Sequence, residues 1–189
     1  MKNRPLSNVI GFDDAPFDST HIGAVKVVGA VFAGIRLDGV LVGEVEKDGF
    51  DSAQTLATLV SNSRFAQQTN LIMLQGIALA GFNVVDVFSL HQHLDLPILV
   101  VSRRSPDIQS IQRALLGGIP HGQEKWHIIQ QLGPMEPVCR VYVQRVGLSL
   151  ERARSVIERS TVYSHVPEPL RCAHLFAGAL VNGESRGDP

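Results

Sequence analysis

The sequence predicts one α/β domain over residues 1–189, with a mixed sheet flanked by helices. Valine-rich, strand-like runs fill the first quarter of the chain, and short all-apolar runs follow, separated by segments with helical spacing. With 189 residues, 44% of them hydrophobic, the chain can bury a substantial core. No internal repeat or interdomain linker divides it, so we expect a single domain.

Strands are expected first along the chain. They cover Asn8–Asp13, Ala24–Phe32 and Val40–Glu46, and the last alternates between two faces. Ala15-Pro16 ends the first strand, because proline cannot donate to the ladder of hydrogen bonds. We expect these strands to pair in an antiparallel manner.

Helices and buried strands then alternate. A helix containing Leu56, Leu59 and Val60 begins at a capping box formed by Asp51 and Gln54. The later expected elements are a strand at Leu71–Leu74, a helix at Val84–Leu94, a strand at Leu96–Val101, a helix opened by Ser105-Pro106 and closed by Gly117-Gly118, a shorter helix within Pro120–Gly133, a strand at Val138–Val146, and helices at Leu150–Ser160 and Pro167–Val181. We expect the tail at 182–189 to be frayed and flexible.

This order of elements is similar to that of a ribonuclease H-like fold, in which the first strand lies beside the fourth. The ends of those two strands and the last helix would then surround one crevice. Open α/β sheets place their ligands in such a crevice.

Composition excludes several classes of protein. The formal net charge of -1 gives no chain-wide positive field, so any contact with nucleic acid must be local. The longest apolar run, Ile22–Ile35, is interrupted by Lys26 and by glycines and is too short to span a membrane. Residues 1–8 lack a secretory signal, and Cys139 and Cys172 form no metal-spaced pattern. We therefore expect a soluble, cytoplasmic protein. Motifs for acyl transfer, hydride transfer and NTP hydrolysis do not occur.

Acidic residues at strand ends are the first candidates for a site. Asp13 and Asp14 end the first strand on opposite faces, so only one can face a given site, and we favour Asp13 as a ligand for Mg²⁺. A turn at Asp-Asp-Ala-Pro is the alternative. Asp48 and Asp51 lie after the third strand, where they could equally form a turn and a helix cap. Gln75 ends the fourth strand and can offer only a neutral carbonyl oxygen.

Two further segments carry candidate residues. Gly81-Phe82-Asn83 leads into a helix whose free N–H groups could hold a phosphate, although Asn83 and Asp86 have the spacing of a helix cap. On the last helix His174 lies at the edge of the buried stripe, with Arg171 on the same side. A structural histidine and a ligand or proton carrier are equal alternatives for His174.

These segments together resemble the endonuclease dU family over nearly the whole chain. They are Ile10-Gly11-Phe12-Asp13-Asp14, Asp48-Gly49-Phe50-Asp51, Gly76-Ile77 with Gly81-Phe82-Asn83-Val84-Val85-Asp86, Leu96-Pro97-Ile98 and Pro167-Glu168-Pro169-Leu170-Arg171-Cys172-Ala173-His174. The family is similar in turn to endonuclease V, a ribonuclease H-like, Mg²⁺-dependent nuclease that cleaves nucleic acid near a deaminated base. The resemblance implies cleavage of DNA that contains deoxyuridine.

The resemblance also implies roles for residues. Asp13 matches the metal aspartate of the first strand, and His174 matches the histidine or aspartate that follows the Pro-Glu-Pro-x-Arg-x-Ala motif. Endonuclease V has a glutamate after its third strand, and Asp51 or Asp48 is the nearest candidate for that position here. Gln75 departs from the pattern, because endonuclease V has an aspartate there, and the strand-separating Pro-Tyr-Ile-Pro segment is missing. The implied catalytic residues are Asp13, Asp51 and His174, and the implied ligands of Mg²⁺ or Mn²⁺ are Asp13, Asp14, Asp48, Asp51, Gln75 and His174.

The implied substrate is DNA with a deaminated base turned out of the helix. Phe82 and the backbone of the Gly81–Asn83 loop form the expected pocket for that base. Arg103, Arg104 and Arg113 could hold backbone phosphates or form a solvated face, and Arg171 is a further substrate-binding candidate. The alternatives are a homologue with weakened catalysis that binds nucleic acid or a protein partner, and a hydrolase of a small phosphorylated molecule. A homodimer is also expected.

Overall fold

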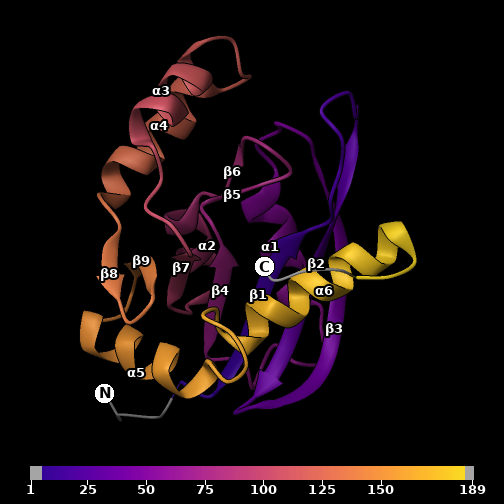
Figure 1. The fold of residues 1–189 in the computed structure, drawn as a ribbon, viewed down its shortest axis with the longest axis vertical. Coiled ribbons are helices and arrows are strands. Elements are labelled where there is room, and N and C mark those ends of the chain that lie inside the picture. The colour runs from indigo at the N-terminus through magenta and orange to yellow at the C-terminus, as the bar shows by residue number, and fades with distance from the viewer. Residues whose placement is uncertain (1–5, 186–189) are drawn as a thin grey trace.

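A seven-stranded mixed sheet forms the centre of the structure, a computed structural model that describes residues 6–185 (Figure 1). Its strands, in the order β3-β2-β1-β4-β7-β9-β8 across the sheet, are β3 (Arg36–Glu46), β2 (Ala24–Ala33), β1 (Asn8–Asp14), β4 (Leu71–Gln75), β7 (Ile98–Ser102), β9 (Val141–Val146) and β8 (Glu136–Val138). β1, β4 and β7 are parallel, and the other pairs are antiparallel. The predicted antiparallel start and the predicted pairing of β1 with β4 are confirmed.

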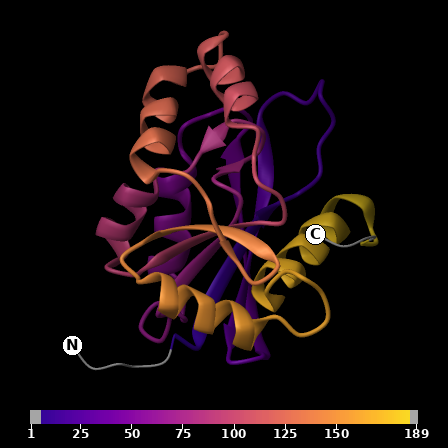
Figure 2. The same ribbon diagram turned by 60° about the vertical axis from the view of Figure 1, so that its left-hand side comes forward.

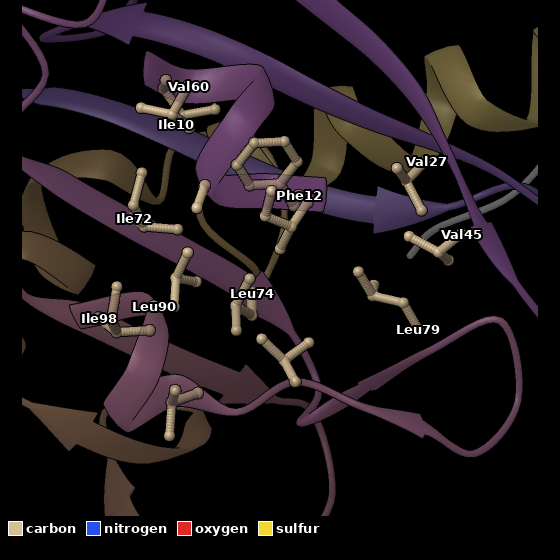
Figure 3. Packing of buried hydrophobic residues seen from close by; sticks show 14 of the residues in the cluster. Ile10, Phe12, Val27, Val45, Val60, Ile72, Leu74, Leu79, Leu90 and Ile98 are labelled. Atoms are coloured by element: carbon tan, nitrogen blue, oxygen red, sulfur yellow. The ribbon is translucent and has the colours of Figure 1, made fainter. Parts of the chain in front are cut away.

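Helices cover both faces of this sheet (Figures 1 and 2). They are α1 (Ser52–Ser61), α2 (Val87–Leu94), α3 (Ile108–Leu116), α4 (Gly122–Leu132), α5 (Leu150–Ser160) and α6 (Glu168–Asn182). The side chains of Ile10 and Phe12 pack with α1 and α2 on one face, as Figure 3 shows for Ile10, Phe12, Val60 and Leu90. Val9 packs on the opposite face in the cluster that includes α5 and Leu170 of α6. Alternation along β1 therefore assigns each of its side chains to one helical layer.

A small hairpin and two helices extend the domain at one edge. β5 (Ala78–Leu79) and β6 (Asn83–Val84) pair in an antiparallel manner, and the buried side chain of Val84 packs with residues of α3 and α4. In Figure 1 these helices stand beyond the ends of β4 and β7. The edge of the sheet where the parallel strands end is therefore lined by the hairpin and by α3 and α4.

The predicted helix at Val84–Leu94 begins later than expected. Asn83 and Val84 belong to β6, and α2 starts at Val87. Asp86 is the N-cap, because its side chain accepts hydrogen bonds from the N–H groups of Phe88 and Ser89. Asn83 therefore does not cap this helix, and the predicted pair of Asn83 and Asp86 is wrong.

Other boundaries also differ from the prediction. The strand expected at Val138–Val146 is divided into β8 and β9 by a turn in which Cys139 has a φ of 55°. α3 starts after Asp107, whose side chain accepts from Ser110 N–H, and not at Ser105-Pro106. The capping box predicted from Asp51 does not form, since Asp51 makes no side-chain cap hydrogen bond. In each case a turn residue has a role that periodicity alone does not show.

The ends of the chain lie partly beyond the structural description. α6 ends at Asn182, and Gly183 adopts a left-handed conformation with a φ of 74°. Of the tail predicted to be flexible, residues 186–189 lie outside the described residues. Within residues 6–185, no helix has both the length and the apolar character needed to cross a membrane.

α6 crosses β1 at very close range. A Cβ atom on Gly11 would lie 2.5 Å from the carbonyl carbon of Pro169 and 2.7 Å from its oxygen. Only glycine fits there, because the backbone of the helix start occupies the space of a side chain. This contact fixes the distance between β1 and α6 two residues before Asp13.

We expect Gly11→Ala to destabilise the protein by about 1–3 kcal/mol, because overpacking would push α6 away from β1. Urea unfolding measures this loss. Gly178→Ala is the matched control on α6, since its Cβ would meet Ser185 at no less than 3.8 Å, and it should stabilise the helix by about 0.5–1 kcal/mol. Equal unfolding midpoints for Gly11→Ala and the wild type would contradict the assigned role of this contact.

Candidate active site

Asp13 and His174 form a hydrogen-bonded pair between β1 and α6. Nδ1 of His174 lies 2.9 Å from Oδ2 of Asp13, although 161 positions separate the two residues. Oδ1 of Asp13 accepts a hydrogen bond of 3.0 Å from the N–H of Asp14. The side chain of Asp13 is 8% exposed and that of His174 is 37% exposed. The pair is therefore buried at the carboxylate and open to solvent at the imidazole.

Burial and pairing change the acidity of both groups. Burial raises the pKa of Asp13, while its hydrogen bond with His174 acts in the opposite direction. The hydrogen bond to Asp13 raises the pKa of His174, while burial of the ring and the positive charge of Arg103 oppose this rise. The raised pKa of Asp13 and the raised pKa of His174 both favour a proton shared by these two side chains. Because Nδ1 is turned toward Asp13, Nε2 is the ring atom left for other chemistry.

Gln75 lies beside Asp13 on the same face of the sheet. β1 and β4 pair Gly11 with Met73 and Phe12 with Leu74, so the next positions are Asp13 and Gln75. Met73 packs on the face that α6 covers, and Gln75, two positions later, points to that face. Oε1 of Gln75 is buried and accepts no hydrogen bond from residues 6–185. A polar oxygen without a partner therefore lies next to the pair.

The structure places Asp14 and Asp48 in a different role from the predicted metal ligands. Oδ2 of Asp14 accepts from Ala80 N–H at 3.0 Å, and Oδ1 of Asp48 accepts from Phe82 N–H at 2.8 Å. The backbone N–H of Asp48 also donates to the carbonyl of Ala80. A Cβ on Gly81 would lie 2.5 Å from Oδ1 of Asp48, so the turn needs glycine there. These carboxylates hold the hairpin against the sheet on the face opposite Asp13.

Asp51 and Asn83 form a separate structural network. Nδ2 of Asn83 donates to Oδ1 of Asp51 at 2.6 Å and to the carbonyl of Glu46 at 2.8 Å, while Oδ1 of Asn83 accepts from Ser52 N–H. Asn83 is fully buried. The network ties the end of β3 and the start of α1 to β6. Asp51 and Asn83 thus have a structural role at this junction, and their implied catalytic, metal-ligand and substrate-binding roles stay predictions.

Arg171 is engaged within its own helix. Its guanidinium donates to both carboxylate oxygens of Glu168, with a shortest distance of 2.7 Å, and Glu168 is 5% exposed. The guanidinium also lies 5.8 Å from the ring centroid of Tyr163. This pair joins the start of α6 to the preceding loop, which is a structural role and not the predicted substrate contact. Arg103 follows β7, is exposed, and is close enough to act on the pKa of His174.

The donor set fits a hydrated Mg²⁺ and not an enclosed metal centre. Within residues 6–185 no group of three or more His, Cys, Asp or Glu side chains is arranged to hold a metal ion. Asp13 supplies a carboxylate and Gln75 an unpartnered amide oxygen beside it. Mg²⁺ commonly binds one or two carboxylates and keeps several waters. Asp13 and Gln75 supply enough oxygen ligands for an ion that keeps several of its waters.

A cavity of about 290 Å³ lies between the hairpin and α3, on the face of the sheet opposite Asp13. Gly76, the residue after Gln75, contributes to its wall, as do Gly81 and Phe82. Its other lining residues are Ile77, Ala78, Val84, Ser102, Pro106, Ile108, Ile111, Ile129, Met135 and Gln144. The wall is mainly apolar, and the volume of the cavity lies just below the range typical of ligand pockets, about 300–1,000 Å³. It can hold one small, planar group.

Sequence reasoning missed several residues that shape this region. Ala80 holds both Asp14 and Asp48 through its backbone, with a φ of 47° that is unusual for alanine. Lys125 is buried, and its Nζ donates to the carbonyl of Asp48 at 2.7 Å from α4. Gln144 faces the cavity from β9. No pattern in the sequence marks them, because each acts across the tertiary structure.

Solved structures with this fold define its class. Endonuclease V from Ciona intestinalis, in complex with a 24mer DNA containing an inosine followed by a ribo-adenosine, is 12% identical and gives a TM-score of 0.60 over 90% of this chain and 84% of that chain. Endonuclease V from Bacillus subtilis is 10% identical, with a TM-score of 0.61 over 94% and 81%. The domain therefore has the endonuclease V-like fold.

Closer relatives define the family. Residues 5–181 match the family model described as Endonuclease dU, and the chain belongs to this family. A UPF0215 protein of Deinococcus radiodurans is 48% identical over 182 residues, which cover 96% of this chain and 93% of that protein. The crystal structure of a protein of unknown function from Archaeoglobus fulgidus is 32% identical, with a TM-score of 0.86 over 93% of this chain and 99% of that chain. The predicted family and fold are confirmed.

The acidity of Asp14 gives a test of this geometry. Burial, aided by the charge of Asp13, raises the pKa of Asp14 to about 6. The unfolded chain releases this proton at about pH 4, so the folded state loses stability as the pH rises from about 4 to 6. Asp14→Asn removes the charge and keeps an oxygen for Ala80 N–H. We expect the variant to be more stable than the wild type at pH 8, by up to about 3 kcal/mol.

Urea unfolding at pH 8 and at pH 4 measures this difference, which should shrink toward zero at the lower pH. Asp14→Ala is the control, because it removes both the charge and the hydrogen bond to Ala80. If Asp14→Asn and the wild type differ equally at both pH values, ionisation of Asp14 is not the cause.

Proposed function

We propose that this protein is a Mg²⁺-dependent endonuclease that hydrolyses a phosphodiester bond in DNA at or near deoxyuridine. The observation that carries the proposal is the contact of Asp13 with His174 at the edge where β1 and β4 end. Membership of the Endonuclease dU family and the endonuclease V-like fold support a nuclease. The related endonuclease V from Ciona intestinalis was crystallised with inosine-containing DNA, which supports a substrate with a deaminated base.

Asp13 and Gln75 are the residues that would hold the ion, Mg²⁺ or Mn²⁺. The chemistry that such an ion supplies is polarisation of the phosphodiester and stabilisation of the leaving oxygen. Asp13 brings the charge, and Gln75 brings a buried oxygen that has no other partner among residues 6–185. Oδ2 of Asp13 is the oxygen that contacts Nδ1 of His174. Gln75 adds no charge of its own, so we expect weak binding that the phosphates of the substrate strengthen.

His174 is positioned to move a proton. Its Nδ1 donates to Asp13, which fixes the ring and leaves Nε2 on the more exposed side of the imidazole. In its neutral form Nε2 can take a proton from water, and in its charged form it can give one to a leaving oxygen. Because the carboxylate stabilises the charged imidazole, the hydrogen bond with Asp13 favours the second role.

DNA contacts would come from the surroundings of this pair. Arg103 is the exposed cation near His174 and would contact a backbone phosphate. The cavity lined by Gly81 and Phe82 would receive the base after it is turned out of the duplex. A DNA substrate also agrees with the predicted cytoplasmic location. The homodimer expected from the sequence stays a prediction.

A nicking assay tests the reaction directly. We expect the protein, with Mg²⁺ or Mn²⁺, to cut a duplex containing deoxyuridine and to leave a matched duplex without it intact. Asp13→Asn and His174→Ala should each lower the rate at least about 100-fold, because one removes the ligand charge and the other the proton carrier. His93→Gln is the control, since His93 is exposed and bonds only within α2.

A matched duplex with deoxyinosine shows which deaminated base the protein prefers. Retention of DNA without cutting would indicate the weakened homologue expected from Gln75, and would contradict an endonuclease. Failure to bind either duplex would favour a small phosphorylated substrate.

Metal binding can be measured separately from cutting, through the stability of the folded protein. We expect Mg²⁺ at ten times its dissociation constant to stabilise the wild type by about 1.4 kcal/mol, because it binds only the folded state. Asp13→Asn should lose this gain, and Gln75→Leu should reduce it, while Gln75→Asp should increase it by restoring a charge. Thermal unfolding with and without Mg²⁺ measures each variant. An undiminished gain in Asp13→Asn would place the ion elsewhere.

A further inference from the structure

Gln144 is one of two polar side chains, with Ser102, that line the apolar cavity among the described residues. It lies on β9, pairs with Val100 of β7, and is 6% exposed. Its neighbours in the cavity wall include Met135 and Ile129, which offer no hydrogen bond from their side chains. A buried amide in such surroundings must satisfy both its donors and its acceptor or leave them for a ligand.

A hydrogen bond fixes the orientation of this amide. Nε2 of Gln144 donates to the carbonyl oxygen of Gly133 at 2.5 Å. Gly133 has a φ of 80°, a conformation that suits glycine and sets the direction of its carbonyl group. The amide nitrogen is therefore the atom next to Gly133, and Oε1 is the other atom of the group. Within residues 6–185 no group donates a hydrogen bond to Oε1 of Gln144. Oε1 is also not one of the buried side-chain atoms that lack a partner in this part of the chain.

We propose that Oε1 of Gln144 reads the ring N–H of a deaminated base held in this cavity, and so determines which base is accepted. The inference rests on the proposed function, since it assigns the base-reading atom of the same site. Deamination replaces an exocyclic amino group by a carbonyl and leaves a proton on the neighbouring ring nitrogen. Uracil and hypoxanthine therefore present an N–H donor where cytosine and adenine present a lone pair.

Oε1 of Gln144 would discriminate between uracil and cytosine through the ring nitrogen that faces it. A lone pair on the ring nitrogen of cytosine would face Oε1, and neither group could pair, which is costly in an apolar site. Thymine shares the ring N–H of uracil, but it is normally paired with adenine. Uracil derived from cytosine lies opposite guanine, and extrusion of a mismatched base costs less. The Gln144 acceptor and the cost of extrusion together select deaminated bases.

A binding measurement without cutting tests recognition of the base separately from hydrolysis. The wild-type protein in EDTA is titrated against two labelled duplexes that differ only in deoxyuridine or deoxycytidine opposite the same guanine. We expect tighter binding to deoxyuridine, and Gln144→Leu should reduce that preference at least about tenfold, because leucine fills the space without an acceptor. Affinity for the deoxycytidine duplex should stay within about threefold of the wild type, since contacts with the DNA backbone are unchanged.

Gln144→Glu separates base reading from a structural role. Glutamate keeps an acceptor oxygen at the same length, so it should retain more of the preference than leucine does. Equal loss in both variants, with equally lowered thermal stability, would show that Gln144 only holds Gly133 and would overturn the inference. A wild-type duplex test with N3-methyldeoxyuridine, which lacks the ring N–H, should give no preference.

The endonuclease activity and the role of Gln144 are contradicted by different results. If the wild type cuts deoxyuridine DNA and Gln144→Leu shows the same preference for that base, the reading by Gln144 is wrong and the endonuclease proposal stands. If the wild type neither cuts nor prefers deoxyuridine DNA, the proposed function is wrong and the assignment of Gln144 falls with it.

Discussion

The close crossing of α6 over β1 is the constraint on which the site depends. Pro169 occupies the space that a side chain at position 11 would need, so the helix lies directly on the strand. Asp13 follows two residues later on the same face of β1, and His174 follows more than one turn later on α6. A shift of either element would separate them, because a hydrogen bond weakens rapidly beyond about 3.2 Å.

The two faces of β1 divide the acidic residues between function and structure. Asp13 points to the layer of α6 and meets His174, whereas Asp14 points to the hairpin and binds Ala80 N–H. Asp48 holds the same turn from β3, so the hairpin is fixed on both sides. This arrangement fixes the hairpin wall of the cavity on that face of the sheet. Carboxylates at this sheet edge therefore position the hairpin through hydrogen bonds to its backbone.

Polar groups that lack partners mark the places where a ligand fits. Oε1 of Gln75 is buried beside Asp13, and the amide of Gln144 is held by Gly133 at the other side of the cavity. Buried polar atoms normally find partners within the protein. Gln75 lies on the α6 face of the sheet and Gln144 on the opposite face, so the proposed substrate would have to reach both faces at the sheet edge.

The sequence by itself determined the α/β class and the antiparallel start, which follow from periodicity and proline positions. The order of elements, compared with a ribonuclease H-like fold, predicted the pairing of β1 with β4, and the family resemblance singled out Asp13 and His174, which the structure brings together. Only the tertiary structure decided the roles of Asp51 and Asn83, because hydrogen bonds between distant segments consume their polar groups. Gln144 likewise carries no local signal. A side chain's partners depend on which strands and turns meet in space, and sequence spacing does not encode that.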